Sequence, residues 1–162
     1  MKVGVIGSGA MGTIFGLAMA RSGDDVMFYD VRPDLIATIE EDGLRLEGVL
    51  GTFHLRPNAT LRPEQLGEIE CALVAVDANA TPQAAKVVAS CLSRQGFALS
   101  LQNGIGNVEA LGEALGLWLL VRPTIVGLPL DLREYSIRTL AQLGSVKRSA
   151  AAVSVFAILR EE

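Results

Sequence analysis

Three glycines near the N-terminus restrict the folds open to this chain more than any other feature of its sequence. Gly7, Gly9 and Gly12 have the spacing G-x-G-x-x-G. They follow a short apolar run at residues 2–6 and precede residues 11–22, whose apolar side chains recur at helical spacing. A strand, a glycine turn and a helix in this order begin a βαβ unit, in which the start of the helix faces the phosphates of a dinucleotide. The predicted phosphate-binding residues are Gly7, Ser8, Gly9, Ala10, Met11 and Gly12.

Each position of the motif requires glycine for a different physical reason. Gly7 permits a tight turn, Gly9 lets the backbone approach a pyrophosphate without an intervening Cβ, and Gly12 lets the helix pack closely on the sheet. The alternative interpretation of the same residues is a glycine-rich turn that serves close packing alone.

Asp30 ends the next apolar run, where a dinucleotide-binding fold places the carboxylate that binds the adenosine ribose. Such a carboxylate favours NAD(H), whereas Arg32 has the charge to hold the 2′-phosphate of NADP(H). At about 4 Å each of these charge interactions amounts to roughly 1–4 kcal/mol, so the pair predicts a small preference between the two cofactors. In the alternative interpretation, Asp30 caps the turn before Pro33 and Arg32 is a solvated surface charge.

Strand and helix patterns alternate along the rest of the chain. Apolar runs at residues 73–76 and 97–101 each precede a helical pattern. Thr81 is the predicted N-cap of the first of these helices and Asn107 that of the second. This alternation predicts an α/β domain over residues 1–145, with a doubly wound, mostly parallel sheet of the Rossmann type.

Two segments depart from the alternation. Residues 44–56 change to a period of two around Gly48 and Gly51, which predicts a small antiparallel excursion of two strands. Residues 150–159 are apolar on every side, which predicts a C-terminal helix within residues 146–162. We expect that helix either to pack on the sheet or to form an interface with a partner chain or a second copy of this chain.

Composition argues against several classes of partner. The chain has 162 residues with 14 basic and 18 acidic side chains, a formal net charge of −4, and it lacks the basic patch of a nucleic-acid-binding protein. Its longest apolar stretch, residues 150–159, is shorter than the roughly 20 residues of a membrane-spanning helix. Cys71 and Cys91 fall on a predicted strand and helix, as small core residues of a reducing compartment would. We therefore expect a cytoplasmic protein with no metal centre, no nucleic-acid partner and no membrane segment.

Four segments carry a resemblance to a known family. They are GSGAMG at residues 7–12, GLRL at 43–46, LVAV at 73–76 with the helix from Thr81, and above all LQNGIGN at 101–107. Together, over roughly residues 1–130, they resemble the N-terminal domain of the ketopantoate reductases (2-dehydropantoate 2-reductases). The resemblance implies NADPH-dependent reduction of a 2-oxo acid in pantothenate synthesis, by a two-domain chain whose second domain is helical.

The resemblance also assigns roles to two neighbouring side chains. Asn103 would lie beside the nicotinamide as the catalytic residue of this domain and position cofactor or substrate, and Gln102 would lie against the cofactor. A carboxamide suits this task because it donates and accepts hydrogen bonds without titrating. The Asn-Gly pair at residues 103–104 is also explained by a turn that needs left-handed backbone angles.

The chain departs from the family in two respects. Asp77, assigned to the cofactor site, stands where the family usually has a lysine, so an anion replaces an expected cation. The family's general-acid lysine belongs to the helical second domain, and none of Lys2, Lys86 and Lys147 matches its position. We therefore expect this chain to be inactive as a reductase without a second helical domain.

Two functions are compatible with these residues. The first is an oxidoreductase, or the cofactor-binding domain of one, that moves hydride from NAD(P)H to a 2-oxo acid; the resemblance favours NADP(H), with NAD(H) as the alternative. The second is a non-catalytic dinucleotide-binding module that senses the cofactor or regulates a partner. A helical domain, encoded downstream or supplied by another chain, would favour the first.

Overall fold

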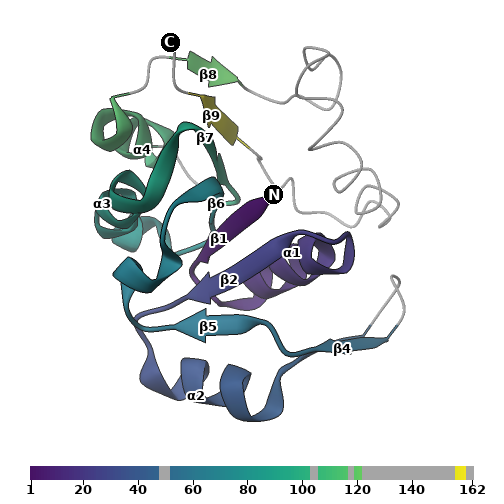
Figure 1. The fold of residues 1–162 in the computed structure, drawn as a ribbon. Coiled ribbons are helices and arrows are strands. Elements are labelled where there is room, and N and C mark those ends of the chain that lie inside the picture. The colour runs from purple at the N-terminus through teal and green to yellow at the C-terminus, as the bar shows by residue number, and fades with distance from the viewer. Residues whose placement is uncertain (48–51, 103–105, 117–118, 122–155, 160–162) are drawn as a thin grey trace.

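Helices and strands alternate along the computed structural model, which describes residues 1–47, 52–102, 106–116, 119–121 and 156–159 (Figure 1). The strands are β1 (Lys2–Ile6), β2 (Asp25–Tyr29), β3 (Leu44–Leu46), β4 (Phe53–Leu55), β5 (Asn58–Thr60), β6 (Ile69–Val74), β7 (Leu92–Ser100), β8 (Leu119–Val121) and β9 (Phe156–Leu159). The helices are α1 (Ala10–Arg21), α2 (Pro33–Asp42), α3 (Thr81–Cys91) and α4 (Asn107–Leu115), with the 3₁₀ segments η1 (Pro63–Leu66) and η2 (Ala78–Ala80).

The described strands form a seven-stranded sheet in the order β5-β2-β1-β6-β7-β9-β8 and a separate two-stranded sheet of β3 and β4. From β5 to β7 all neighbouring strands are parallel. Along the chain, β2 and then β5 are added on one side of β1, and the chain then crosses to β6 on the other side of β1. In an open parallel sheet, ligands bind outside the carboxyl ends of the strands at such a crossover. The predicted doubly wound, mostly parallel fold is confirmed.

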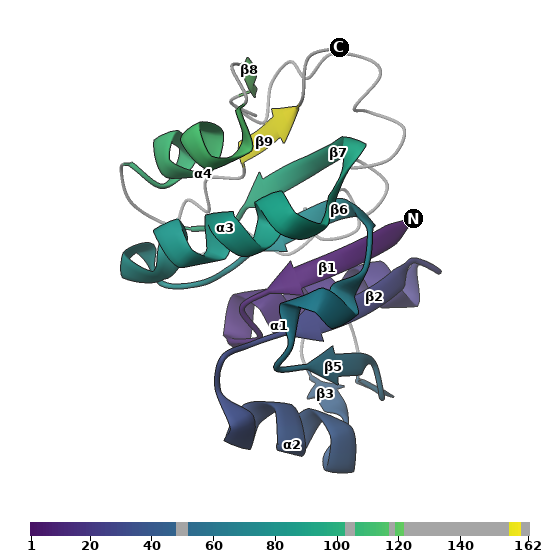
Figure 2. The ribbon, with the colours of Figure 1, turned by 60° about the vertical axis from the view of Figure 1, so that its left-hand side comes forward.

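Each face of the sheet has its own hydrophobic core beneath its own helices. Side chains alternate along β1, so Val3 and Val5 point to one face and Ile6 to the other. α1 and α2 cover the face of Val3, through residues that include Met19 and Ile39. α3 and α4 cover the opposite face (Figure 2). The central strands are therefore buried on both sides, as strands of a parallel sheet usually are.

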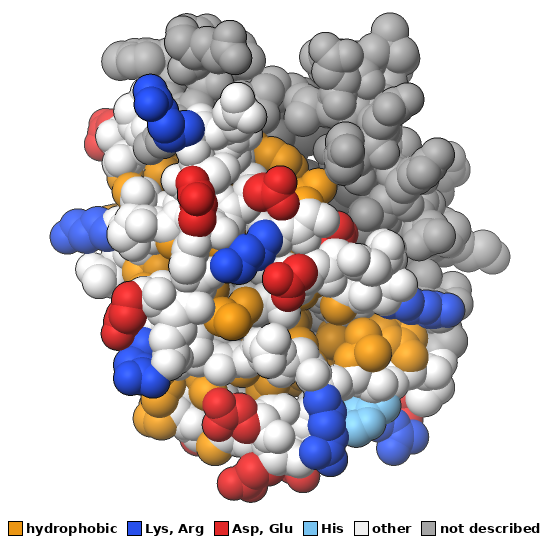
Figure 3. All heavy atoms as spheres, viewed as in Figure 1, with side chains coloured by type: hydrophobic (Ala, Val, Ile, Leu, Met, Phe, Trp, Pro, Cys, Tyr) orange, Lys and Arg blue, Asp and Glu red, His pale blue; other side chains and the backbone are white. Residues whose placement is uncertain are grey.

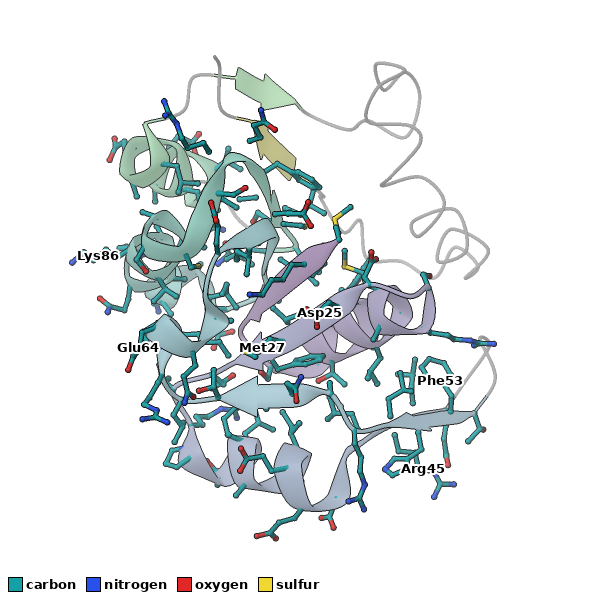
Figure 4. All side chains as sticks on the ribbon, in the orientation of Figure 1. Asp25, Met27, Arg45, Phe53, Glu64 and Lys86 are labelled. Carbon is teal, nitrogen blue, oxygen red and sulfur yellow. The ribbon has the colours of Figure 1, made fainter. Side chains whose placement is uncertain are left out.

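The strands β3 and β4 form the predicted antiparallel excursion. Arg45 pairs with His54 in the register of this hairpin, and both side chains are exposed. The guanidinium of Arg21 on α1 lies 4.9 Å from the centre of the Phe53 ring, a cation–π distance (Figure 4). The imidazole Nε2 of His54, the single histidine of the chain, lies 2.6 Å from the carbonyl oxygen of Asp42. These contacts occupy the hairpin itself, away from the glycine turn.

The C-terminal apolar segment differs from the prediction where the structure describes it. Residues 156–159 form β9, which pairs antiparallel with β7 and β8, in place of the helix that the sequence predicts for residues 150–159. A run that is apolar on every side fits a buried strand as well as a buried helix, because it carries no periodicity. Pairing with β9 also satisfies the N–H and C=O groups along one edge of β7. The helix prediction is therefore wrong for residues 156–159, and the remainder of residues 146–162 lies outside the described part.

The described surface mixes the two signs of charge. Acidic and basic side chains are interspersed over the face shown in Figure 3. Val31 and Leu61 are the exposed large hydrophobic side chains among the described residues, and they follow the neighbouring strands β2 and β5 at their carboxyl ends. None of the described helices has the length and apolar character needed to cross a membrane.

Candidate functional site

The glycine turn between β1 and α1 packs against the carboxyl end of β6. Gly7 has a backbone φ of +99°, and a Cβ on it would lie 2.8 Å from Cγ1 of Val76 and 2.9 Å from the carbonyl carbon of Ala75. The N–H of Gly7 donates to the carbonyl oxygen of Tyr29 at 2.9 Å. L side chains rarely adopt this φ, so both the backbone and the packing require glycine here.

Gly12 lets α1 begin in direct contact with the turn. A Cβ on Gly12 would lie 2.0 Å from the carbonyl oxygen of Gly7 and 3.1 Å from Cγ1 of Val5. Real Cβ atoms essentially never come within 3.0 Å of another atom in this way. The helix and the turn therefore touch through their backbones, as the spacing of the motif predicts.

Gly9 has neither of these reasons to be glycine. It is the N-cap of α1, with φ −69° and ψ −171°, a conformation open to any L residue. No described atom lies within 4 Å of a Cβ placed on it. Close packing alone therefore accounts for Gly7 and Gly12 but leaves Gly9 unexplained, and the space in front of Gly9 is open to a ligand.

The start of α1 carries a partial positive charge that its own residues leave uncompensated. Ala10 and Met11 open this helix, no side chain caps it, and its first turn holds no acidic residue. The helices α2 and α4 carry Asp34 and Glu109 in their first turns, whereas α3, like α1, has no acidic residue there. The free N–H groups of a helix start, together with a dipole of roughly half an elementary charge, attract anions. The predicted phosphate-binding residues are thus gathered around one exposed helix start.

Asp30 and Arg32 form an ion pair, which the sequence did not predict. Nε of Arg32 lies 3.3 Å from Oδ1 of Asp30, and the backbone N–H of Arg32 donates to the same oxygen at 3.1 Å. Oδ2 of Asp30 accepts from the N–H of Ser8 at 2.8 Å. The Asp30 side chain is 9% exposed, whereas that of Arg32 is 55% exposed.

This pairing shows how the two side chains are arranged, and the small preference expected between the two cofactors stays a prediction. The carboxylate of Asp30 joins the end of β2 to the glycine turn and is neutralised by Arg32, while the guanidinium of Arg32 faces solvent. Asp30 also closes the turn before Pro33 through the N–H of Arg32, so its predicted capping role is present as well.

A buried polar network lies at the carboxyl ends of β6 and β7. Nε2 of Gln102 donates to the carbonyl oxygen of Val76 at 2.9 Å and to Oγ1 of Thr81 at 2.6 Å. Oγ1 of Thr81 donates to Oδ1 of Asn107 at 2.8 Å. Oγ of Ser100 donates to Oε1 of Gln102 at 3.1 Å. The side chains that form the network belong to residues at most 5% exposed.

This network changes the roles predicted for its members. Thr81 and Asn107 are the first residues of α3 and α4 rather than their N-caps, which are Ala80 and Gly106. The carboxamide of Gln102 is held by protein partners through both its nitrogen and its oxygen, and the contact with the cofactor that the resemblance implies stays a prediction. The spacing of the sequence could not show this, since the partners stand more than 20 residues apart.

Comparison with known proteins tests the resemblance carried by the sequence. Residues 3–128 match the family model described as "Ketopantoate reductase PanE/ApbA". The chain belongs to the ketopantoate reductase family. The resemblance predicted from the glycine turn and the segment at residues 101–107 is thereby confirmed.

Three similar proteins show how much of a ketopantoate reductase this chain spans. The 2-dehydropantoate 2-reductase of Pyrococcus abyssi is 33% identical over 121 residues, which are 72% of this chain and 39% of that protein. A PanE/ApbA family ketopantoate reductase from Ralstonia eutropha JMP134 has a TM-score of 0.66 and 31% identity, over 74% of this chain and 40% of that one. A D-mandelate dehydrogenase with NADH and anilino(oxo)acetate has a TM-score of 0.64 and 21% identity, over 74% and 42%, and shares the fold. The chain spans about two fifths of each.

The residues that depart from the family pattern lie at different places in the fold. Asp77 is exposed at the carboxyl end of β6, where it is the N-cap of η2 and its carbonyl oxygen accepts from the N–H of Ala80 at 2.8 Å. The side chain of Lys86 leaves α3 on its outer side, away from the sheet (Figure 4). Asn103 and Lys147 lie outside the described residues, so the role of Asn103 stays a prediction.

The two cysteines take no part in this site. Cys71 and Cys91 are free and buried, as predicted for core residues. Burial raises the pKa of the Cys71 thiol to about 12 and that of Cys91 to about 11, so both are protonated and unreactive near neutral pH. Within the described ranges, no three His, Cys, Asp or Glu side chains are grouped to hold a metal ion.

Proposed function

We propose that this domain binds a nicotinamide dinucleotide across the carboxyl ends of β2, β1 and β6. The pyrophosphate lies over Gly9 and accepts hydrogen bonds from the free N–H groups that open α1. The observation that carries the proposal is the open space at Gly9, a glycine that neither strain nor packing within the domain explains. Membership of the ketopantoate reductase family supports the same ligand, as does the shared fold of the dehydrogenase with NADH.

The adenosine half of the ligand lies at the end of β2, and the cofactor is NADP(H). Arg32 supports this choice, because its side chain is 55% exposed and its carboxylate partner is held in place by the N–H of Ser8. A 2′-phosphate on the ribose would find a positive group that is already oriented. Val31, which is 70% exposed between the paired residues, offers an apolar surface for the adenine.

The reaction proposed for the whole protein is hydride transfer to a 2-oxo acid. A bound reduced nicotinamide supplies the hydride, and the oxygen of the substrate then needs a proton. A positioned general acid typically contributes roughly 10²–10⁴-fold to such a step. Lys86 points away from the site, so we assign the proton donor and most substrate contacts to a second helical domain. Asn103 positions the cofactor or the substrate.

Titration of Gly9 variants tests the site. Gly9→Ala and Gly9→Val add side chains into space that the domain leaves open, so their stability should fall only by the preference of a helix N-cap for glycine, about 1 kcal/mol or less, and by a similar amount in both. The same side chains obstruct a pyrophosphate, so affinity for NADPH should fall in steps, by about 10-fold or more for Gly9→Val, the loss of at least one charge-assisted hydrogen bond. Calorimetry measures the affinity and circular dichroism the melting. Unchanged affinity of Gly9→Val would place the ligand elsewhere.

A further inference from the structure

The hydroxyl of Thr81 joins the end of one strand to the start of a helix. It accepts from Nε2 of Gln102, which lies two residues beyond the end of β7, and donates to Oδ1 of Asn107, the first residue of α4. Thr81 is 1% exposed and stands at the start of α3, on a different βα unit. The end of β7 and the starts of α3 and α4 are therefore held by one buried oxygen.

The hydrogen bonds of this network have a fixed direction. The Gln102 carboxamide donates from its nitrogen to Val76 and Thr81, and it accepts at its oxygen from Ser100. Because Gln102 already donates to the Thr81 hydroxyl, the proton of that hydroxyl is directed to Asn107. A group without a hydroxyl at position 81 would remove the acceptor of one Gln102 N–H and the donor to Asn107 inside the domain.

The network is also joined to the glycine turn through Val76. The carbonyl oxygen of Val76 accepts from Gln102, and its Cγ1 lies 2.8 Å from where a Cβ on Gly7 would be. The strand order is β2-β1-β6-β7, so Asp30, the glycine turn and the network follow one another along the same edge of the sheet. An extended dinucleotide with its adenosine at β2 and its pyrophosphate at β1 must place its remaining half over β6 and β7.

We propose that Thr81 and Gln102 are positioning residues for the nicotinamide half of the dinucleotide. This inference rests on the proposed function and goes beyond it, since neither side chain touches the ligand. They act by fixing the ends of β6 and β7 against which the nicotinamide and its ribose bind. The adenosine half depends on Asp30, Arg32 and the glycine turn instead.

A pair of ligands separates this role from a general effect on stability. NADPH contains both halves of the dinucleotide, whereas 2′-phospho-ADP lacks both the nicotinamide and its ribose. Thr81→Val removes the hydroxyl at nearly constant volume, and Thr81→Ser keeps it. We expect Thr81→Val to weaken NADPH binding by about 5- to 10-fold, as for a buried polar group left unpaired. It should leave the affinity for 2′-phospho-ADP within about 2-fold of that of the unchanged protein, and Thr81→Ser should retain the affinity for both ligands.

Two further variants keep the test decisive. Val88→Ala removes buried volume from α3 outside the network and should lower the melting temperature without changing the ratio of the two affinities. Ser100→Ala removes the hydrogen bond to Oε1 of Gln102 and should weaken NADPH selectively even if Thr81→Val does not fold. Equal losses for the two ligands in the network variants, or no loss of NADPH affinity, would overturn the inference while leaving the proposed site intact. Failure of the unchanged protein to bind either ligand would overturn the proposed function, and the inference with it.

Discussion

Replacing two glycines of α1 by alanine separates the role of this helix in the fold from its role in cofactor binding. Gly12 and Gly16 are both buried and lie about one turn apart. Each substitution gains a similar intrinsic helix propensity, about 0.8–1.0 kcal/mol. The two differ in what the new Cβ meets, so their comparison removes the effect of propensity.

The two clashes fall on different parts of the domain. A Cβ on Gly12 would lie 2.0 Å from the carbonyl oxygen of Gly7 and must move to at least 3.0 Å, so the turn and the helix part by about 1 Å. A Cβ on Gly16 would lie 2.5 Å from Cζ of Phe28, a core side chain on β2. Overpacking of this kind costs about 1–3 kcal/mol. After the propensity gain, each variant should lose up to about 2 kcal/mol of stability, which at roughly 2–4 °C per kcal/mol lowers the melting temperature by up to about 8 °C.

Only the clash at Gly12 should lower the affinity for the cofactor. Separation of the turn from the start of α1 misaligns the N–H groups that face the pyrophosphate. Loss of one charge-assisted hydrogen bond costs about 1.5–3 kcal/mol, which corresponds to a loss of affinity of about 10- to 100-fold. The clash at Gly16 is taken up by the Phe28 ring inside the core, so Gly16→Ala should bind NADPH within about 2-fold of the unchanged protein.

Calorimetric titration with NADPH, at a temperature where all three proteins are folded, measures these affinities. Thermal unfolding followed by circular dichroism measures the change in stability. If Gly12→Ala and Gly16→Ala lose affinity equally, binding simply follows overall stability and the argument from the turn is wrong. If Gly12→Ala binds as tightly as the unchanged protein, the phosphates do not lie on this turn.

Three further outcomes are expected. Arg32→Ala should lower the affinity for NADPH about 10-fold or more, by loss of a charge-assisted contact to the 2′-phosphate, and leave the affinity for NADH nearly unchanged. Equal losses of affinity in titrations with both cofactors would exclude that contact. Stability should fall as pH rises above about 9, because folding raises the pKa of Cys71 from 9.0 to about 12 and that of Cys91 from 9.0 to about 11, so that only the unfolded chain releases these protons. Denaturant titrations at pH 7 and pH 10 measure the fall, and an equal fall in a variant with both Cys71→Ala and Cys91→Ala would assign it to other groups. The 162-residue chain alone should bind cofactor without reducing ketopantoate, since Lys86 points away from the site; loss of NADPH absorbance at roughly 1–10³ turnovers per second would contradict this.

The parts of the fold that the sequence predicted correctly have local signals. The glycine turn has three residues at fixed spacing between a strand pattern and a helix pattern, and the hairpin at residues 44–56 has a change of period. Asp30 directly follows β2, the position at which such a fold places a carboxylate, and its contact with the ribose stays a prediction. Each of these signals lies within a few residues of the structure that it specifies.

The parts that the sequence did not predict depend on distant partners. Thr81 before a proline has the appearance of an N-cap, yet its hydroxyl bonds to Asn107, 26 residues further along the chain. The ion pair of Asp30 and Arg32 depends on the side-chain geometry of a turn, which residue types alone do not fix. The strand β9 depends on the free edge of β7, since residues 156–159 carry no periodicity of their own.

The structure joins the two halves of the proposed site before any ligand binds. At Val76 the side chain packs against the glycine turn while the carbonyl oxygen is held by Gln102. Apolar contact alone would leave the strand ends free to slide, because it has no direction, whereas a hydrogen bond fixes both distance and angle. Ordering a free backbone residue costs about 1–2 kcal/mol, and a long ligand that contacts several loops would have to meet that cost at each of them. A buried polar network in an otherwise apolar core is therefore understandable at this place, because it sets the spacing of the loops during folding rather than during binding.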